Sequence, residues 1–260
     1  MTSRIVGITA IVALSAAGTA MAGPINGTFN SGSNSGLRTN VAVQAVAQAT
    51  TFNVGALTHA WAGGTGETAI YNGSHASFCI DNQYASTSLR IFNLVRITQA
   101  PIAASGNWGN PGVSYTTTQE RRLNAIVLAA RNAGYVNNLG FFNVSQGQDA
   151  SVAIQLLSWE SLWEPDSQSG NWNVATNQGT FYRTSAISAN AATIIGNLVN
   201  AATTIFNDVN TPILVRSLSS NGGQDQFVLV PLPPAAWAGL STLAGVGFVG
   251  YIRRRKNAAQ

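Results

Sequence analysis

Two side chains are the candidates for chemistry in this chain: the thiol of Cys79 and the carboxamide of Gln155. Cys79 is the only cysteine, so it has no intramolecular disulfide partner. An exposed thiol would be open to oxidation in an oxidising compartment, whereas a buried one packs as a small hydrophobe. Taken alone, Cys79 fits either interpretation.

Gln155 belongs to a helix that we expect over residues 149–164. Its N-cap is Asp149, and Pro165 ends it. At about 100° per residue, Gln155 falls on an apolar stripe of this helix. The other residues of the stripe are Val152, Leu156, Trp159, Leu162 and Trp163. A buried amide without hydrogen bonds costs about 1–3 kcal/mol, so we expect Gln155 to be hydrogen-bonded or chemically altered. Glu160 and Glu164 are expected on a solvated face, away from Gln155.

The helices and strands expected from the sequence, which must position these side chains, indicate an α+β fold. We expect a single globular domain with a β lobe and a helical middle section. Helices are expected over residues 117–134, 149–164 and 185–206, the first with capping-box spacing from Thr117 to Glu120. Strands are expected over residues 69–81 (a hairpin with an Asn72-Gly73 turn), 88–98, 213–218 and 226–230, and near Phe181. Residues 41–54 fit either a strand or a helix.

Other kinds of site find little support. His59 and His75 have no acidic or cysteine partner at ligand spacing, so we expect no metal site. The sequence has no phosphate-binding loop and no Ser/His/Asp pattern, and we expect no cofactor. Trp61, Trp108 and Trp172 leave open a noncovalent carbohydrate-binding module that uses them as stacking platforms.

The charge distribution excludes nucleic acid as a partner. Only 8% of the 260 residues are charged, and the formal net charge is +4. Residues 23–230 nevertheless hold eight arginines against nine carboxylates, so the excess positive charge belongs to the two ends. A nucleic-acid-binding domain would carry its basic residues on the folded body.

The N-terminal end has the organisation of a secretory signal peptide over residues 1–22. Arg4 precedes an apolar run over residues 5–17, and Ala20-Met21-Ala22 forms a small-residue cleavage site. We therefore expect an exported mature chain that begins near Gly23.

The C-terminal end, residues 230–260, has three parts. A motif of Val230, Pro231, Leu232, Pro233 and Pro234 precedes eighteen uncharged residues, 235–252. A basic stop of Arg253, Arg254, Arg255 and Lys256 follows. Eighteen helical residues span about 27 Å, nearly the thickness of a bilayer core, and the basic stop would stay on the cytoplasmic side.

This tail resembles the PEP-CTERM sorting signal of bacterial exported proteins. In that family, an exosortase recognises a Pro-containing motif, a membrane helix and a basic end. Leu232 stands where the family usually has Glu. The resemblance implies an exosortase as partner, a transient inner-membrane anchor, and delivery to the cell envelope, cell surface or extracellular matrix. Residues 23–229 would then form the exported body.

Three segments of the body resemble bacterial thioester domains, which are adhesin-type surface modules with an internal Cys–Gln bond. The segments are Phe-Cys-Ile-Asp at 78–81, Asn-Ala-Gly-Tyr at 132–135 and Ile-Gln-Leu-Leu-Ser-Trp at 154–159, in the family's order. Cys79 and Asp81 match the family's aromatic-Cys-aliphatic-Asp segment. Gln155 and Trp159 match its Thr-Gln-x-Ala-x-Trp helix, with Ile154 in place of Thr and Leu157 in place of Ala.

The resemblance implies that Cys79 and Gln155 form a thioester, with Asp81 and Trp159 in the surrounding pocket. An amine or hydroxyl of a surface or matrix component would open the bond and remain attached at residue 155. Such a protein reacts once and is not an enzyme. The alternatives are a non-reactive structural or matrix protein of the same fold, or the carbohydrate-binding module.

Overall fold

The computed structural model describes residues 22–30, 35–45, 48–81, 85, 87–100, 114–164, 172–175, 179, 181–220 and 223–231. The predicted signal peptide, the tail from Leu232 onward and Trp108 lie outside these residues. No helix within the described ranges has the length and apolar character needed to cross a membrane.

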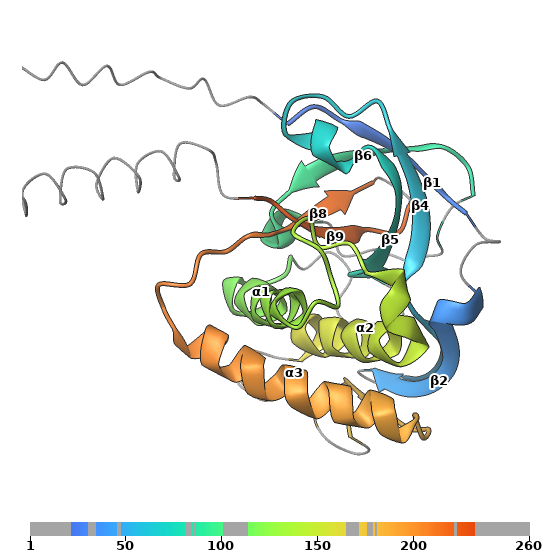
Figure 1. Cartoon of the computed structure of the whole chain (residues 1–260), viewed down its shortest axis with the longest axis vertical. Helices are drawn as coiled ribbons and strands as arrows, with labels where there is room; N and C mark the ends of the chain where they lie inside the picture. Colours follow the sequence, from blue (N-terminus) through green and yellow to red (C-terminus); the bar gives the residue numbers. More distant parts are fainter. Residues whose placement is uncertain are drawn as a thin grey trace, which may run out of the picture. The chain divides into compact units, whose positions relative to one another are not determined.

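Six antiparallel strands close into a barrel in the order β1-β4-β5-β9-β8-β6 (Figure 1). They are β1 (Ile25–Phe29), β4 (Leu57–Ala62), β5 (Gly73–Cys79), β6 (Arg90–Val95), β8 (Val215–Ser219) and β9 (Gln226–Leu229). In one apolar cluster of the barrel, the rings of Trp61 and Phe92 meet edge-on with centroids 4.9 Å apart. A Cβ at Gly27 would lie 2.4 Å from the Trp61 ring. The two rings can therefore pack here only because residue 27 has no side chain.

A second sheet has three antiparallel strands in the order β3-β2-β7. They are β2 (Arg38–Ala45), β3 (Gln48–Gly55) and β7 (Phe181–Arg183). The segment at 41–54, which the sequence left between strand and helix, therefore forms two paired strands. Val41, Val43 and Val54 are fully buried, and the alternation of Val41 with Val43 fits a strand with one face on the core.

Three helices pack together below the barrel in the view of Figure 1: α1 (Thr117–Asn132), α2 (Gly147–Trp163) and α3 (Ala189–Asn207). Helix α2 contacts α1, α3 and strands β2, β3, β5 and β7. All residues from Ala150 to Trp163 are buried, as expected for a helix that is apolar on every side. Helix α3, by contrast, buries Ala191, Ile194, Leu198 and Ala202 along one stripe.

The predicted mixed α+β class is confirmed, as are the strands at 88–98, near Phe181, at 213–218 and at 226–230. The predicted hairpin at 69–81 is wrong. Residues Gly66–Tyr71 form a 3-10 helix, and β5 is a single strand after it. Thr65 and Thr68 form a capping box at this short helix, and the buried Tyr71 hydroxyl donates to the Leu229 carbonyl at 3.1 Å. These contacts stabilise a helical turn where β propensity favoured a strand.

The predicted helix starts are displaced. Helix α1 has its N-cap at Thr116, one residue before the expected Thr117. Helix α2 begins at Gly147, so Asp149 is not its N-cap. The Asp149 carboxylate instead accepts hydrogen bonds from the Ser188 hydroxyl and the Asn190 amide at the start of α3. Ser188 caps α3, which begins at Ala189 rather than near 185.

Candidate functional site

Helix α2 docks where β4 begins and β5 ends. The Ser151 hydroxyl accepts a hydrogen bond from Ala56 N at 2.7 Å, and one helical turn later Gln155 reaches Cys79 at the end of β5. The close approach requires a glycine at residue 55, where φ is +138°. A Cβ there would lie 2.3 Å from the Leu37 carbonyl oxygen and 2.9 Å from Ser151 Oγ.

The Gln155 carboxamide pairs with the backbone of Cys79. Its Oε1 accepts from Cys79 N at 3.1 Å, and its Nε2 donates to the Cys79 carbonyl at 2.8 Å. The register of β4 on β5 begins at Leu57 opposite Ser77 and does not extend to Cys79. The side chain of Gln155 therefore supplies the hydrogen bonds that a longer β4 would have made.

The thiol of Cys79 contacts the same carboxamide. Its Sγ donates to Gln155 Oε1 at 3.3 Å. Both side chains are withdrawn from solvent: Cys79 is 3% exposed and Gln155 is 0% exposed. A nucleophilic sulfur and an amide carbonyl thus face one another in the protein interior.

The surroundings keep Cys79 in its thiol form. Burial raises the pKa of Cys79 well above its ordinary range, and the Asp81 carboxylate raises it further. Hydrogen bonds from the Cys79 backbone and the Trp159 side chain act in the opposite direction. At neutral pH the sulfur therefore carries its proton.

The structure brings Asp81 and Trp159 to the same place. Asp81 is 1% exposed, and its Oδ2 accepts from Asp225 N at 3.1 Å. Trp159 lies edge-on to Phe52, with ring centroids 5.6 Å apart. The four predicted residues Cys79, Gln155, Asp81 and Trp159 therefore form one cluster.

Two further residues of this cluster were missed by sequence reasoning. Tyr115 is buried, and its hydroxyl donates to the Ile80 carbonyl at 3.0 Å. Asp225 accepts from Ile80 N through its backbone carbonyl at 3.0 Å, and burial raises the pKa of its carboxyl to about 7. In sequence Asp225 is far from Asp81, and the pairing of β9 with β5 brings the two residues together.

The expectation that Glu160 and Glu164 form a solvated face is wrong, because both are buried. Glu160 Oε1 accepts from Asn173 N at 3.0 Å, and Glu164 Oε1 accepts from Phe181 N at 2.7 Å. Burial, followed by the neighbouring Glu164, raises the pKa of Glu160 to about 9. The far side of α2 therefore faces Asn173 and Phe181 instead of solvent.

The buried acidic residues lie beside a buried cation. Arg122 is fully buried, donates to the Glu164 backbone carbonyl at 3.4 Å, and lies 5.6 Å from the Trp172 ring centroid. Trp172 is itself buried, and its indole N–H donates to Ser161 Oγ at 2.8 Å. Trp61 is also buried, so neither tryptophan is an exposed stacking platform for carbohydrate.

The two histidines lie on β4 and β5. His59 is buried and stacks on Trp61 with ring centroids 5.1 Å apart, and burial lowers the pKa of His59 to about 4. His75 stacks on Phe141 at 4.1 Å. In the part of the chain that the structure describes, no group of three or more His, Cys, Asp and Glu side chains is arranged to hold a metal ion.

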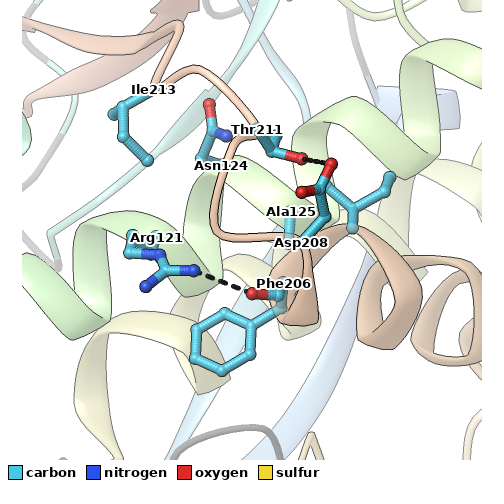
Figure 2. A pocket seen from close by; sticks show the side chains of 8 residues that line it. Arg121, Asn124, Ala125, Phe206, Asp208, Thr211 and Ile213 are labelled. Carbon is cyan, nitrogen blue, oxygen red and sulfur yellow. Dashed lines mark hydrogen bonds between the residues drawn. The ribbon is translucent and has the colours of Figure 1, made fainter.

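A small hollow lies between α1, the end of α3 and the segment leading to β8 (Figure 2). Figure 2 shows Arg121 directed at the Phe206 carbonyl, 2.9 Å away, and the Thr211 hydroxyl bonded to Asp208. Asn124 bonds the backbone of Pro212 and Leu214. These polar groups join α1 to the following chain, and the hollow shares no residue with the Cys79–Gln155 contact.

Of the sorting motif, the structure describes Val230 and Pro231. Val230 N donates to the Leu214 carbonyl at 2.9 Å, and Pro231 is exposed. Leu232 to Pro234 and the basic stop lie outside the described residues.

Comparisons with protein-family models, with curated proteins and with solved structures find no match for this chain. The resemblance to thioester domains is therefore a matter of a few residues around Cys79 and Gln155. The contact geometry of those residues is the basis for a functional assignment.

Proposed function

We propose that this protein is an exported, adhesin-like module that attaches covalently to a surface or matrix component through a thioester between Cys79 and Gln155. The observation that carries the proposal is the contact of the thiol with the carboxamide oxygen, 3.3 Å apart and shielded from water. Holding a nucleophile and a carbonyl in contact removes much of the entropic barrier to their reaction.

The bond would form with loss of ammonia. Cys79 Sγ bonds to Gln155 Cδ, the Cδ–Nε2 bond breaks, and the thiol hydrogen leaves with the nitrogen. The raised pKa of Cys79 disfavours a free thiolate, but the thiol lies within hydrogen-bonding distance of Oε1. Proton transfer to Oε1 during S–C bond formation avoids a buried anion. When the Cδ–Nε2 bond breaks, the same proton passes from Oε1 to Nε2. The Cys79 N–H, 3.1 Å from Oε1, polarises the carbonyl during the attack.

The thioester would then be consumed by attachment. An amine or hydroxyl of the target attacks the carbonyl of residue 155, an amide or ester bond forms, and the Cys79 thiol is released. The only lysine is Lys256, beyond the predicted membrane segment. The body therefore has no lysine side chain that would open its own thioester. Each molecule reacts once, so the protein is not an enzyme.

Export and sorting complete the proposal. A signal peptide at residues 1–22 would direct the chain out of the cytoplasm, and an exosortase would recognise the tail at 230–260. Residues 235–252 would hold the chain in the inner membrane until processing. The support is the sequence organisation of the two ends.

A non-reactive structural or matrix protein is the second candidate. It is favoured by the hydrogen bonds of Gln155, because the Cys79 backbone already satisfies both Oε1 and Nε2. A buried amide with both polar atoms paired needs no chemical change to be stable.

Peptide mapping separates the two candidates. The body contains arginine but no lysine, so trypsin places Cys79 in peptide 39–90 and Gln155 in peptide 132–183. A thioester predicts that these peptides are linked and lighter by one ammonia, and that methylamine separates them and labels residue 155. Both results should be lost in Cys79→Ala and Gln155→Ala and retained in Gln148→Ala, an exposed glutamine of the same helix. Unlinked peptides with an intact Gln155 and a free thiol would favour the second candidate.

Sorting has its own test. Truncation of the chain after Pro234 should alter its processing and its retention in the envelope. Replacement of Arg253, Arg254, Arg255 and Lys256 by alanine should do the same. Unchanged processing and location in both variants would contradict the sorting proposal, without bearing on the thioester.

A further inference from the structure

A second nucleophile on β5 also contacts a glutamine. Ser77 Oγ donates to Gln226 Oε1 at 3.1 Å and lies 3.3 Å from His59 Nδ1. Ser77 and Gln226 are fully buried, and His59 is 2% exposed. A hydroxyl, an imidazole nitrogen and a carboxamide therefore meet within the barrel, a site that the Cys79–Gln155 reaction does not use.

Strand geometry explains this arrangement. Ser77 and Cys79 are two residues apart on β5, so their side chains share one face of the sheet. Strand β9 pairs with β5 in a register that sets Gln226 opposite Cys79 and diagonal to Ser77. His59 comes from β4, on the other side of β5, where Leu57 is opposite Ser77. Three neighbouring strands thus each contribute one member of the group.

We propose that Ser77 and Gln226 are joined by an internal ester bond. Ser77 Oγ bonds to Gln226 Cδ, and the Cδ–Nε2 bond breaks. His59 Nδ1 takes the hydroxyl proton and passes it to the departing nitrogen, which leaves as ammonia. The reaction needs no other reactant, and His59 ends unchanged.

The surroundings of His59 hold its ring in place and keep it uncharged. Its ring is held between Phe29, with centroids 5.7 Å apart, and Trp61, at 5.1 Å. Burial keeps the imidazole neutral at neutral pH, which leaves one ring nitrogen able to accept the serine proton. Among the described residues, the leaving nitrogen of Gln226 has long contacts of 3.5 and 3.3 Å to Gln224, so its loss removes little hydrogen bonding there.

The ester would join β9 to β5. The chain leaves the barrel through β9, and Pro231 follows two residues later at the start of the proposed sorting tail. A pull on the C-terminal end would act on the Val230–Leu214 hydrogen bond and then on the hydrogen bonds of β9. An ester at Gln226 would pass that load to β5, the strand that carries Cys79. The bond requires no thioester and is independent of the proposed attachment chemistry.

Peptide mapping of the full chain tests the ester directly. Trypsin places Ser77 in peptide 39–90 and Gln226 in peptide 217–253, which contains neither member of the proposed thioester. We expect these two peptides to be linked with the loss of one ammonia. The link should survive neutral methylamine, which opens thioesters, and should be cleaved by alkali. It should persist in Cys79→Ala, so the failure of either crosslink is distinguishable from that of the other.

Variants assign the roles. Ser77→Ala should remove the link, Ser77→Thr should keep it, and His59→Gln should slow its formation at least tenfold. Ser217→Ala is the matched control, because Ser217 is equally buried in β8 and its hydroxyl has no hydrogen-bond partner among the described residues. Unlinked peptides from the folded wild-type chain, with either Gln or Glu at residue 226, would overturn the proposal.

Discussion

Helix α2 buries two polar regions that are satisfied in different ways. At its centre, the uncharged amide of Gln155 meets the backbone and the thiol of one strand residue, Cys79. Toward its C-terminal end, the carboxyls of Glu160 and Glu164 accept hydrogen bonds from backbone N–H groups. The first region places an electrophile against a nucleophile, and the second places acceptors against donors. The kind of partner, rather than burial alone, distinguishes a candidate reaction site from a structural one.

The largest effect should follow removal of the cation from the acidic region. Arg122→Met keeps a long apolar side chain but leaves Glu160 and Glu164 without the neighbouring buried charge. We expect a loss of about 3–5 kcal/mol in the free energy of unfolding, measured by urea denaturation. Arg131→Met is the control, because Arg131 lies in the last turn of α1, the helix that also carries Arg122. It should cost about 0.5 kcal/mol or less. Equal losses in the two variants would show that the acidic region does not depend on Arg122.

The corresponding change at the centre of α2 is Gln155→Glu, made in a Cys79→Ala background so that no thioester contributes. A carboxylate cannot donate to the backbone carbonyl of residue 79, which accepts from Nε2 at 2.8 Å. We expect a loss of about 1–3 kcal/mol at neutral pH. The loss should shrink in acid, where the introduced carboxyl is protonated and regains a donor. Gln148→Glu, at an exposed position of α2, is the control, and a similar loss there would refute the importance of this hydrogen bond.

The acidic region should also make stability depend on pH. The pKa of Glu160 is about 9 in the folded protein and about 4.5 when unfolded. Between these values the folded state holds the extra proton, so the free energy of unfolding should fall as the pH rises. Glu160→Gln should reduce the decline between about pH 5 and pH 8 by at least 1.4 kcal/mol, the equivalent of one pKa unit.

A comparison of Glu160→Gln with wild type isolates the contribution of Glu160 to the pH dependence. Asp225, whose pKa is raised to about 7, contributes a decline of the same sign in both proteins and cancels in the comparison. Thermal unfolding of wild type and Glu160→Gln at the two pH values provides the data. An unchanged pH dependence would mean that Glu160 is already ionised in the folded protein.

The sequence predicted the central region better than the acidic one. Gln155 stood out because a single amide interrupted an apolar stripe, and its burial and hydrogen bonding are confirmed. The same periodicity placed Glu160 and Glu164 in solvent, because it assumed that one side of the helix faces water. Helix α2 has neighbours on all sides, which is a property of the tertiary arrangement.

Contacts between distant segments account for the other differences. Tyr115 and Asp225 join the site through strand pairing and contacts between segments far apart in the sequence, and no local pattern encodes that register. Asp149 was expected to cap its own helix but bonds to the start of α3. Capping preferences identify residues whose side chains accept hydrogen bonds near a helix start. Which helix such a residue bonds to depends on how the helices pack.

The smallest effect should follow a substitution of Phe52, which packs on Trp159 beside the Cys79–Gln155 contact. Phe52 is half-buried and lies edge-on to Trp159, which is one helical turn from Gln155 on α2. Phe52→Leu should cost about 0.5–1.5 kcal/mol, the value of an aromatic edge contact. If the thioester exists, the looser packing of Trp159 should also raise its rate of reaction with methylamine several-fold, measured from the mass of peptide 132–183. Leu89→Ala, at an exposed position outside the site, should change neither quantity. A destabilised Phe52→Leu variant with an unchanged methylamine rate would show that amines reach residue 155 by a path that does not involve Trp159.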